Sequence, residues 1–240
     1  MSVDGRRHIL AIGGLISGLF ADRMAPLLRY AISLTGKPEP RVLVLPTANE
    51  SDLRWVLEGH PRLAELGARP SHLTLFPQPN VADPAALLEA QDLIFVGGGS
   101  VANMLAVWRV HELELPLRRA WEKGVVLAGV SAGAICWFES GTTDSFGPRL
   151  RPFHQGLGLL RGSYCPHYSL EESRRPTYQG LVATGVLPAG IACDDGAAAH
   201  FVDRELAEIC AEAPGATGYR VVADGSGGFT ETPLPARRLE

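Results

Sequence analysis

The sequence predicts an α/β protein in which helices flank both faces of a mostly parallel sheet, giving three layers. Short runs made only of Val, Ile, Leu and similar residues alternate with longer segments of helical periodicity, and glycine-rich turns follow two of the runs. Strands that are apolar at every position are typical of parallel sheets buried on both faces. Helices must then cover both faces of the sheet.

The individual elements follow from these patterns in chain order. Strands are expected over residues 8–12, 42–45, 73–76, 93–96 and 125–130. Apolar residues at helical spacing predict helices over residues 21–34, 53–67, 84–90, 101–110 and 115–123.

The pattern weakens beyond Gly141, where glycine becomes frequent. Short strands at 191–193, 197–202 and 219–223 predict a smaller antiparallel extension towards the C-terminus. Residues 233–240 are expected to form a loose tail, and residues 1–240 a single domain.

Composition and charge exclude several classes of protein. Of 240 residues, 46% are hydrophobic and 20% charged, as in an average globular protein. The net charge is −4 and no basic stripe is visible, so we expect no nucleic-acid partner. The apolar runs are too short for a membrane span, and glycines interrupt the first of them, so no signal peptide is predicted. A cytoplasmic location is the default expectation.

The four cysteines lack the paired spacing of a metal site. Cys136, Cys165, Cys193 and Cys210 are scattered along the chain. They are expected to be reduced and mostly buried, with no metal bound.

The strongest local motif is Gly129-Val130-Ser131-Ala132-Gly133, which lies between an expected strand and an apolar helical segment. This G-x-S-x-G pattern is typical of a nucleophile elbow, where a sharp turn presents the serine hydroxyl at the edge of the sheet. The N–H of Ala132 would then lie at a helix N-terminus and could stabilise an oxyanion. The alternative is a glycine-flanked serine that merely caps a helix.

A second glycine turn, Gly97-Gly98-Gly99-Ser100, also lies between a strand and a helix. It matches neither common nucleotide-binding pattern, so a phosphate cradle is weakly supported. It could instead supply the other half of an oxyanion hole, or be a tight turn only.

A serine nucleophile needs a base and an acid. Among seven histidines, His167 stands out because Pro166 stiffens the backbone beside it. Asp194 and Asp195 follow an expected strand, and Asp144 is a competitor at the far end of the expected elbow helix. His167 could instead be an ordinary surface or core histidine. Each aspartate could instead be a helix cap or a turn residue.

Taken together, the motifs resemble those of the peptidase E family, serine exopeptidases that include aspartyl dipeptidase and the related cyanophycinase. The resemblance extends from about residue 8 to about residue 201. It is strongest at Gly97-Gly98-Gly99 with Asn103-Met104-Leu105, at Gly129-Val130-Ser131-Ala132-Gly133-Ala134, at Cys165-Pro166-His167-Tyr168 and at Asp194-Asp195-Gly196.

The resemblance implies a fold related to class I glutamine amidotransferases and a catalytic triad. By motif, the triad falls on Ser131, His167 and Asp195, with Asp194 left open as the acid. The oxyanion hole falls on the N–H groups of Gly99 and Ala132.

Two positions depart from the family pattern. Ser100 stands where relatives often have Asn, so it could contact the substrate differently. Asp195 stands where some relatives have Glu, so the histidine must lie closer to its strand.

The resemblance also implies the substrate class: short peptides, with an N-terminal Asp preferred. Arg174 and Arg175 are the candidates to hold the Asp side chain, although pairing with Glu171 and Glu172 is an equal alternative. No cofactor is expected, and a homodimer is one option for the assembly.

Alternative functions are a broader dipeptidase or carboxypeptidase, a cyanophycinase-like β-aspartyl peptidase, and a non-catalytic module that binds small anions. A cysteine-dependent amidotransferase is disfavoured because Cys136 lies five residues beyond the elbow serine.

Overall fold

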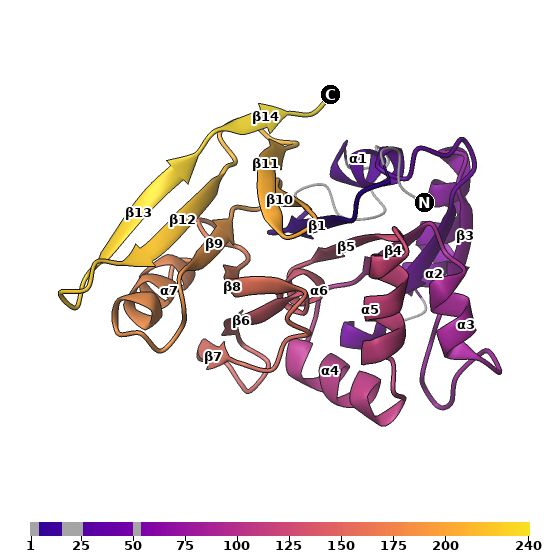
Figure 1. Ribbon diagram of the computed structural model, residues 1–240, viewed down its shortest axis with the longest axis horizontal. Helices are drawn as coiled ribbons and strands as arrows, with labels where there is room; N and C mark the ends of the chain where they lie inside the picture. Colours follow the sequence, from indigo (N-terminus) through magenta and orange to yellow (C-terminus); the bar gives the residue numbers. More distant parts are fainter. Residues whose placement is uncertain (1–4, 16–25, 50–53) are drawn as a thin grey trace.

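The computed structural model describes residues 5–15, 26–49 and 54–240. These residues form two mixed β-sheets with helices packed against them (Figure 1). Among these residues, the larger sheet has the strand order β14-β11-β10-β1-β5-β4-β2-β3. Its strands are β1 (His8–Ile12), β2 (Arg41–Leu45), β3 (Arg69–His72), β4 (Leu93–Val96), β5 (Val126–Val130), β10 (Ala197–Val202), β11 (Glu205–Ala211) and β14 (Ala236–Arg238).

Strands β1 to β5 of this sheet pair in parallel, and β10 joins them antiparallel to β1. Alternate strand residues enter two separate hydrophobic cores: Leu10 and Ile12 face one side, Ile9 and Ala11 the other. Because every position on β1 is buried, residues 9–12 are apolar on both faces of the strand.

Helices cover both faces of the sheet, as predicted. Helices α1 (Pro26–Ser33) and α2 (Arg54–Glu65) contribute Leu27 and Leu63 to one core. The opposite core receives side chains from α3 (Pro84–Glu89), α4 (Val101–Val110) and α5 (Glu114–Glu122). A 3-10 turn at Thr47–Asn49 follows β2.

The smaller sheet corrects the expectation of a single sheet with an antiparallel extension. Its order is β13-β12-β9-β8-β6-β7, and β6, β8 and β9 pair in parallel. The strands are β6 (Phe138–Thr143), β7 (Arg151–Phe153), β8 (Leu160–Cys165), β9 (Gly190–Cys193), β12 (Gly218–Ala223) and β13 (Phe229–Leu234). Helix α7 (Arg174–Ala183) contacts the β12–β13 hairpin (Figure 1).

The sequence did not predict the second sheet because the helix after the elbow is shorter than expected and its first strand begins within the segment expected to be helical. Helix α6 spans only Ala132–Ile135, and Phe138, expected to be helical, begins β6. Thr142 and Thr143 favour an extended backbone, and both are buried in that strand. Asp144 therefore follows a strand and does not end a helix.

Two further expectations were wrong. The third strand is Arg69–His72, not 73–76: Leu73 and Leu75 are buried, but they follow the strand, although the Leu73 N–H still donates to Val44 O. Their apolar character reflects burial alone. The expected loose tail instead includes the end of β13 and strand β14, which pairs in parallel with β11. Residues 21–25 and 53 of the two expected N-terminal helices lie outside the described residues.

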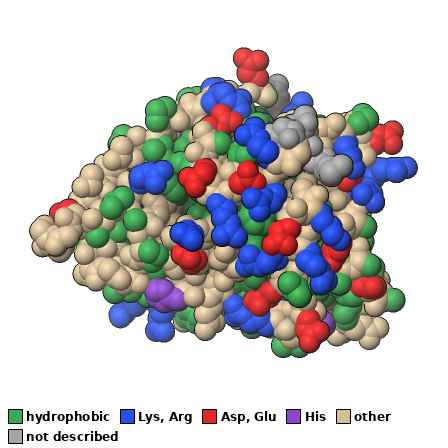
Figure 2. Space-filling model, in the orientation of Figure 1, with side chains coloured by type: hydrophobic (Ala, Val, Ile, Leu, Met, Phe, Trp, Pro, Cys, Tyr) green, Lys and Arg blue, Asp and Glu red, His purple; other side chains and the backbone are tan. Residues whose placement is uncertain are grey.

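Basic and acidic side chains alternate over the face shown in Figure 2, without a large area of one sign. No helix of the described chain combines the length and apolar character needed to cross a membrane.

Candidate active site

The elbow serine lies on a strained turn between β5 and α6. Ser131 has φ 54° and ψ −112°, a backbone conformation that non-glycine residues rarely adopt. Its N–H donates to Ile12 O at 3.0 Å, which fixes the turn to β1. A Cβ on Gly133 would overlap Val96 O, so a glycine is required there for α6 to approach β4. The motif thus forms the predicted elbow.

His167 connects this serine to a carboxylate. Its Nε2 lies 2.9 Å from Ser131 Oγ, and its Nδ1 lies 2.8 Å from Asp195 Oδ1. An ionised carboxylate only accepts hydrogen bonds, so Nδ1–H donates to Asp195. In the neutral ring Nε2 is then an acceptor for the Ser131 hydroxyl.

His167 and Asp195 both follow strands of the second sheet. His167 follows β8, and Asp195 follows the neighbouring parallel strand β9, so both lie at the same edge. The N–H of Tyr168 donates to Cys193 O at 3.1 Å, which ties the histidine turn to β9. A bridge between Gly14 and Asp195 joins this edge to the first sheet.

The structure separates the three candidate acids. Asp194, next to Asp195, is buried and accepts hydrogen bonds from the Ser169 hydroxyl at 2.5 Å and the Thr217 N–H at 3.0 Å. Asp144 is 59% exposed and lies 3.8 Å from Arg174. Only Asp195 of the three contacts His167 among the described contacts.

The backbone donors expected to hold an oxyanion are free to do so. None of the hydrogen bonds found among the described residues engages the N–H groups of Gly99 or Ala132. A Cβ on Gly98 would lie 3.5 Å from Ser131 Cβ, so the glycine turn passes directly beside the serine. The two glycine motifs therefore meet at one point of the sheet edge.

The three residues expected to bind substrate already have structural partners. The Ser100 hydroxyl caps α4 by accepting from the Asn103 N–H at 3.2 Å. Arg174 is 3% exposed and donates to Glu171 Oε2 at 2.7 Å.

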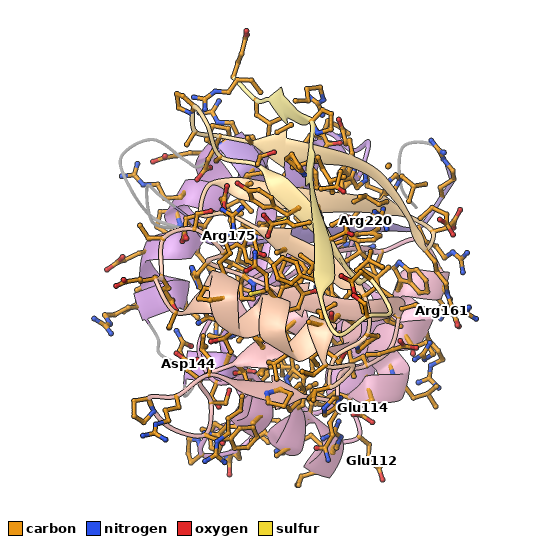
Figure 3. All side chains as sticks on the ribbon, turned by 90° about the vertical axis from the view of Figure 1, so that its left-hand side faces the viewer. Glu112, Glu114, Asp144, Arg161, Arg175 and Arg220 are labelled. Carbon is orange, nitrogen blue, oxygen red and sulfur yellow. The ribbon has the colours of Figure 1, made fainter. Side chains whose placement is uncertain are left out.

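Arg175 donates to Glu231 on β13. Its guanidinium lies over the rings of Tyr168 and Tyr219, at 5.3 and 4.8 Å from their centroids. Figure 3 shows Arg175 well apart from Asp144. Neither arginine is a free cation, because each is paired with a glutamate. The alternative interpretation anticipated the pairing of Arg174 with Glu171, but it expected a solvated arginine and Arg174 is buried.

The cysteines are all free and buried, as predicted. The Cys136 thiol donates to Gly133 O at 3.1 Å, and burial raises its pKa well above the ordinary value. A buried, protonated thiol is a poor nucleophile.

Two features near the site were not predicted. A cavity of about 450 Å³ opens beside the acids and is lined by Leu15, Ser169, Leu170, Asp194, Asp195, Ala213, Pro214 and Ala216. Glu231, on the C-terminal hairpin, is bonded to Tyr168, the residue directly after His167. Neither feature has a local sequence signal, because both depend on segments that meet only in the fold.

The fold and the Ser–His–Asp arrangement define a site of the serine-hydrolase type. The family model of Peptidase family S51 matches residues 10–209. The chain belongs to this family, the peptidase E family, and is a serine peptidase.

One curated relative is similar along nearly the whole chain, and two solved structures share its fold. "Uncharacterized peptidase YgaJ" of Bacillus subtilis (strain 168) is 40% identical over 97% of this chain and 99% of its own length. A peptidase from an acI-B1 Actinobacterium has a similar fold, with a TM-score of 0.66 at 18% identity over 97% of this chain and 96% of its own. A Listeria monocytogenes EGD-e protein assigned as a peptidase E gives a TM-score of 0.59 at 15% identity, over 96% and 100% of the two chains.

Proposed function

We propose that this peptidase is a serine exopeptidase that hydrolyses short peptides through Ser131, His167 and Asp195. The observation that carries the proposal is the continuous chain of contacts from Ser131 Oγ through the imidazole to Asp195 Oδ1. A serine hydroxyl becomes a useful nucleophile when a neighbouring base takes its proton.

In the proposed mechanism, Ser131 Oγ attacks the scissile carbonyl carbon while its proton passes to His167 Nε2. Asp195 holds the ring in the tautomer that leaves Nε2 free and stabilises the imidazolium. His167 then protonates the leaving amine as the C–N bond breaks. Water, activated by the same imidazole, hydrolyses the acyl-enzyme and releases the second product.

The tetrahedral intermediate carries a negative oxygen that needs donors. The N–H groups of Gly99 and Ala132 are proposed to hold it, since no acceptor among the described residues engages them. Each such donor typically contributes about 3 kcal/mol to the stability of the transition state.

A preference for N-terminal Asp is supported by the family resemblance alone. The contacts of Arg174 and Arg175 favour a second candidate function, a dipeptidase of broader specificity. Arg174 and Arg175 are each paired with a glutamate. The cavity beside Asp195 is lined by apolar side chains and two carboxylates, surroundings that disfavour an acidic side chain.

The test is product release from free-ended Asp-Leu, Ala-Leu, β-Asp-Arg and a tripeptide, with wild type and Ser131→Ala run side by side. Ser131-dependent cleavage of any of these supports the peptidase proposal. Selective cleavage of Asp-Leu would establish the aspartyl preference, and equal cleavage of Ala-Leu the broader one. Selective cleavage of β-Asp-Arg would indicate a cyanophycinase-like enzyme.

Two controls separate the remaining alternatives. Activity that resists iodoacetamide excludes an accessible cysteine nucleophile, whereas Cys136 is already disfavoured by its burial. Failure of a fluorophosphonate to label Ser131, together with silence across the peptides, would overturn the proposal in favour of a non-catalytic module.

A further inference from the structure

Glu231 accepts hydrogen bonds from three side chains that reach it from α7 and from the turn after β8. The donors are the Tyr168 hydroxyl, the Arg175 guanidinium and the Gln179 amide, the last at 2.7 Å. The Glu231 side chain is only 13% exposed. It lies on β13, beyond residue 209, where the match to the family model ends. We call Glu231, Tyr168 and Arg175 the Glu231 cluster.

The charges of this cluster are well matched. Burial alone would raise the pKa of Glu231, but the bonds from Tyr168, Arg175 and Gln179 outweigh it and hold the pKa below its ordinary value. Burial, followed by the bond to Glu231, raises the pKa of the Tyr168 phenol. Tyr168 therefore remains a neutral donor to a carboxylate, and such charge-assisted bonds are stronger than neutral ones.

Tyr168 transmits this anchoring to His167 because the two residues are adjacent. The Tyr168 ring is fully buried with Tyr178, while His167 Nε2 contacts Ser131 Oγ. His167 has φ 52°, so its turn is strained and must be held by its surroundings. Two contacts hold it at Tyr168: the phenol bonds Glu231, and the N–H bonds Cys193 O at 3.1 Å.

We propose that Glu231 is a positioning residue, which acts through Tyr168 to hold His167 at Ser131 and Asp195. This inference rests on the proposed function, in which His167 is the base. Without the Glu231 carboxylate, the Tyr168 hydroxyl and the Arg175 guanidinium lose a buried acceptor. The strained turn then relaxes, and the imidazole moves away from Ser131.

The chain contains a matched control for this experiment. Glu208 accepts the Tyr30 hydroxyl at 2.6 Å and two bonds from Arg237, at 2.7 and 2.9 Å. The Arg237 guanidinium lies 5.0 Å from the Tyr30 ring centroid. We call these three residues the Glu208 cluster. It has the same chemistry, but none of its described contacts reaches the proposed triad.

The experiment compares steady-state kinetics of wild type, Glu231→Ala, Glu231→Gln, Tyr168→Phe and Glu208→Gln. For Glu231→Ala we expect kcat to fall about 10- to 100-fold while KM stays within about 2-fold of wild type. The change displaces the reacting atoms but leaves the affinity for substrate nearly unaltered. The rate of Ser131 labelling by a fluorophosphonate should fall by a similar factor. Glu231→Gln retains an acceptor for Tyr168 and should recover most of kcat.

Tyr168→Phe should lower kcat in the same direction. Combined with Glu231→Ala it should cost less than the product of the two single effects, since both changes remove the same contact. Glu208→Gln should lower the Tm and leave kcat unchanged.

Three outcomes would overturn the inference. The first is unchanged kcat and labelling rate in a folded Glu231→Ala protein. The second is an equal loss of kcat in Glu208→Gln, which would make the effect one of general destabilisation. If Glu231→Ala does not fold, the third is an unchanged kcat and labelling rate in Tyr168→Phe, which lacks the hydroxyl that bonds Glu231.

The proposed function is tested separately by Ser131→Ala. If Ser131→Ala is inactive and Glu231→Ala is unaffected, the positioning role of Glu231 is wrong and the peptidase mechanism stands. Activity that persists in Ser131→Ala would remove the mechanism itself.

Discussion

The Glu231 and Glu208 clusters use the same three residue types and the same contacts in two different sheets. In both, a tyrosine hydroxyl and an arginine donate to one glutamate, and the guanidinium stacks on a tyrosine ring. They differ in what the tyrosine adjoins. Tyr168 follows His167 directly, whereas the Tyr30 oxygen lies 2.9 Å from His200 Nδ1.

The comparison shows that a cluster's chemistry does not determine its role. The Glu231 cluster reaches the site through one peptide bond, and its loss should appear in kcat. The Glu208 cluster joins α1, β11 and β14 to a buried histidine pair, His8 and His200, whose ring nitrogens lie 3.0 Å apart. Its loss should appear in stability and its dependence on pH.

The largest expected effect tests the premise of the comparison, that His167 serves Ser131. Ser131→Ala should lower kcat by about 10⁴-fold or more while the Tm stays within a few degrees of wild type. Removing a partly exposed hydroxyl leaves the fold intact, but the acyl-enzyme can no longer form. Peptide hydrolysis and thermal unfolding of the same preparation measure both effects. Retained turnover by that preparation would contradict the nucleophile assignment.

The next effect concerns the proposed acid, Asp195, which contacts His167 Nδ1. Asp195→Asn should lower kcat by about 10³- to 10⁴-fold, because the amide can donate to Nδ1 and stabilise the wrong tautomer. Asp194→Asn is the matched control. Asp194 bonds Ser169 and Thr217, not His167, so this change should lower the Tm and leave kcat nearly unchanged. Reversed results would make Asp194 the acid.

A smaller effect is expected in the pH dependence of stability at the Glu208 cluster. Burial, and next the proximity of His8, lower the pKa of His200 from 6.5 to about 4. The bond from Arg237 is the main reason that the pKa of Glu208 falls to about 2. Both groups bind protons more readily in the unfolded chain, so acid favours unfolding.

The sign and range follow from these values. The contribution of His200 is fully present above pH 6.5 and is lost as the pH falls towards 4. Between pH 7 and pH 5 it amounts to about 2 kcal/mol of unfolding free energy. Urea unfolding at the two pH values measures it, and His200→Gln should have a flatter dependence. An equally steep dependence in the variant would assign the acid sensitivity to other groups.

The smallest expected effect is on substrate preference. Arg174→Gln should change the ratio of kcat/KM for Asp-Leu and Ala-Leu by less than about 3-fold, because Arg174 is buried against Glu171 and is not free to bind substrate. The same variant should lose stability, since it leaves that glutamate unpaired. A fall in the ratio of about 10-fold or more would show that Arg174 recognises the substrate.

Sequence indicated the proposed nucleophile more specifically than the proposed acid. The elbow is a local pattern: the serine, its glycines and the strand before it are consecutive, so their spacing alone indicates the turn. The proposed acid, Asp195, lies 64 positions from Ser131, and sequence left Asp194 and Asp144 open as alternatives. Which of them meets His167 depends on how β9 ends beside β8.

Sequence by itself determined the class of fold, the parallel strands β1, β2, β4 and β5, and the elbow, because these follow from apolar periodicity and turn residues close together in the chain. Only the tertiary structure decided that a second sheet carries His167 and Asp195, that Arg174 and Arg175 are already paired, and that Glu231 reaches Tyr168. The partners of a charged side chain depend on strand pairing across long separations, and short-range sequence patterns carry no information about that pairing.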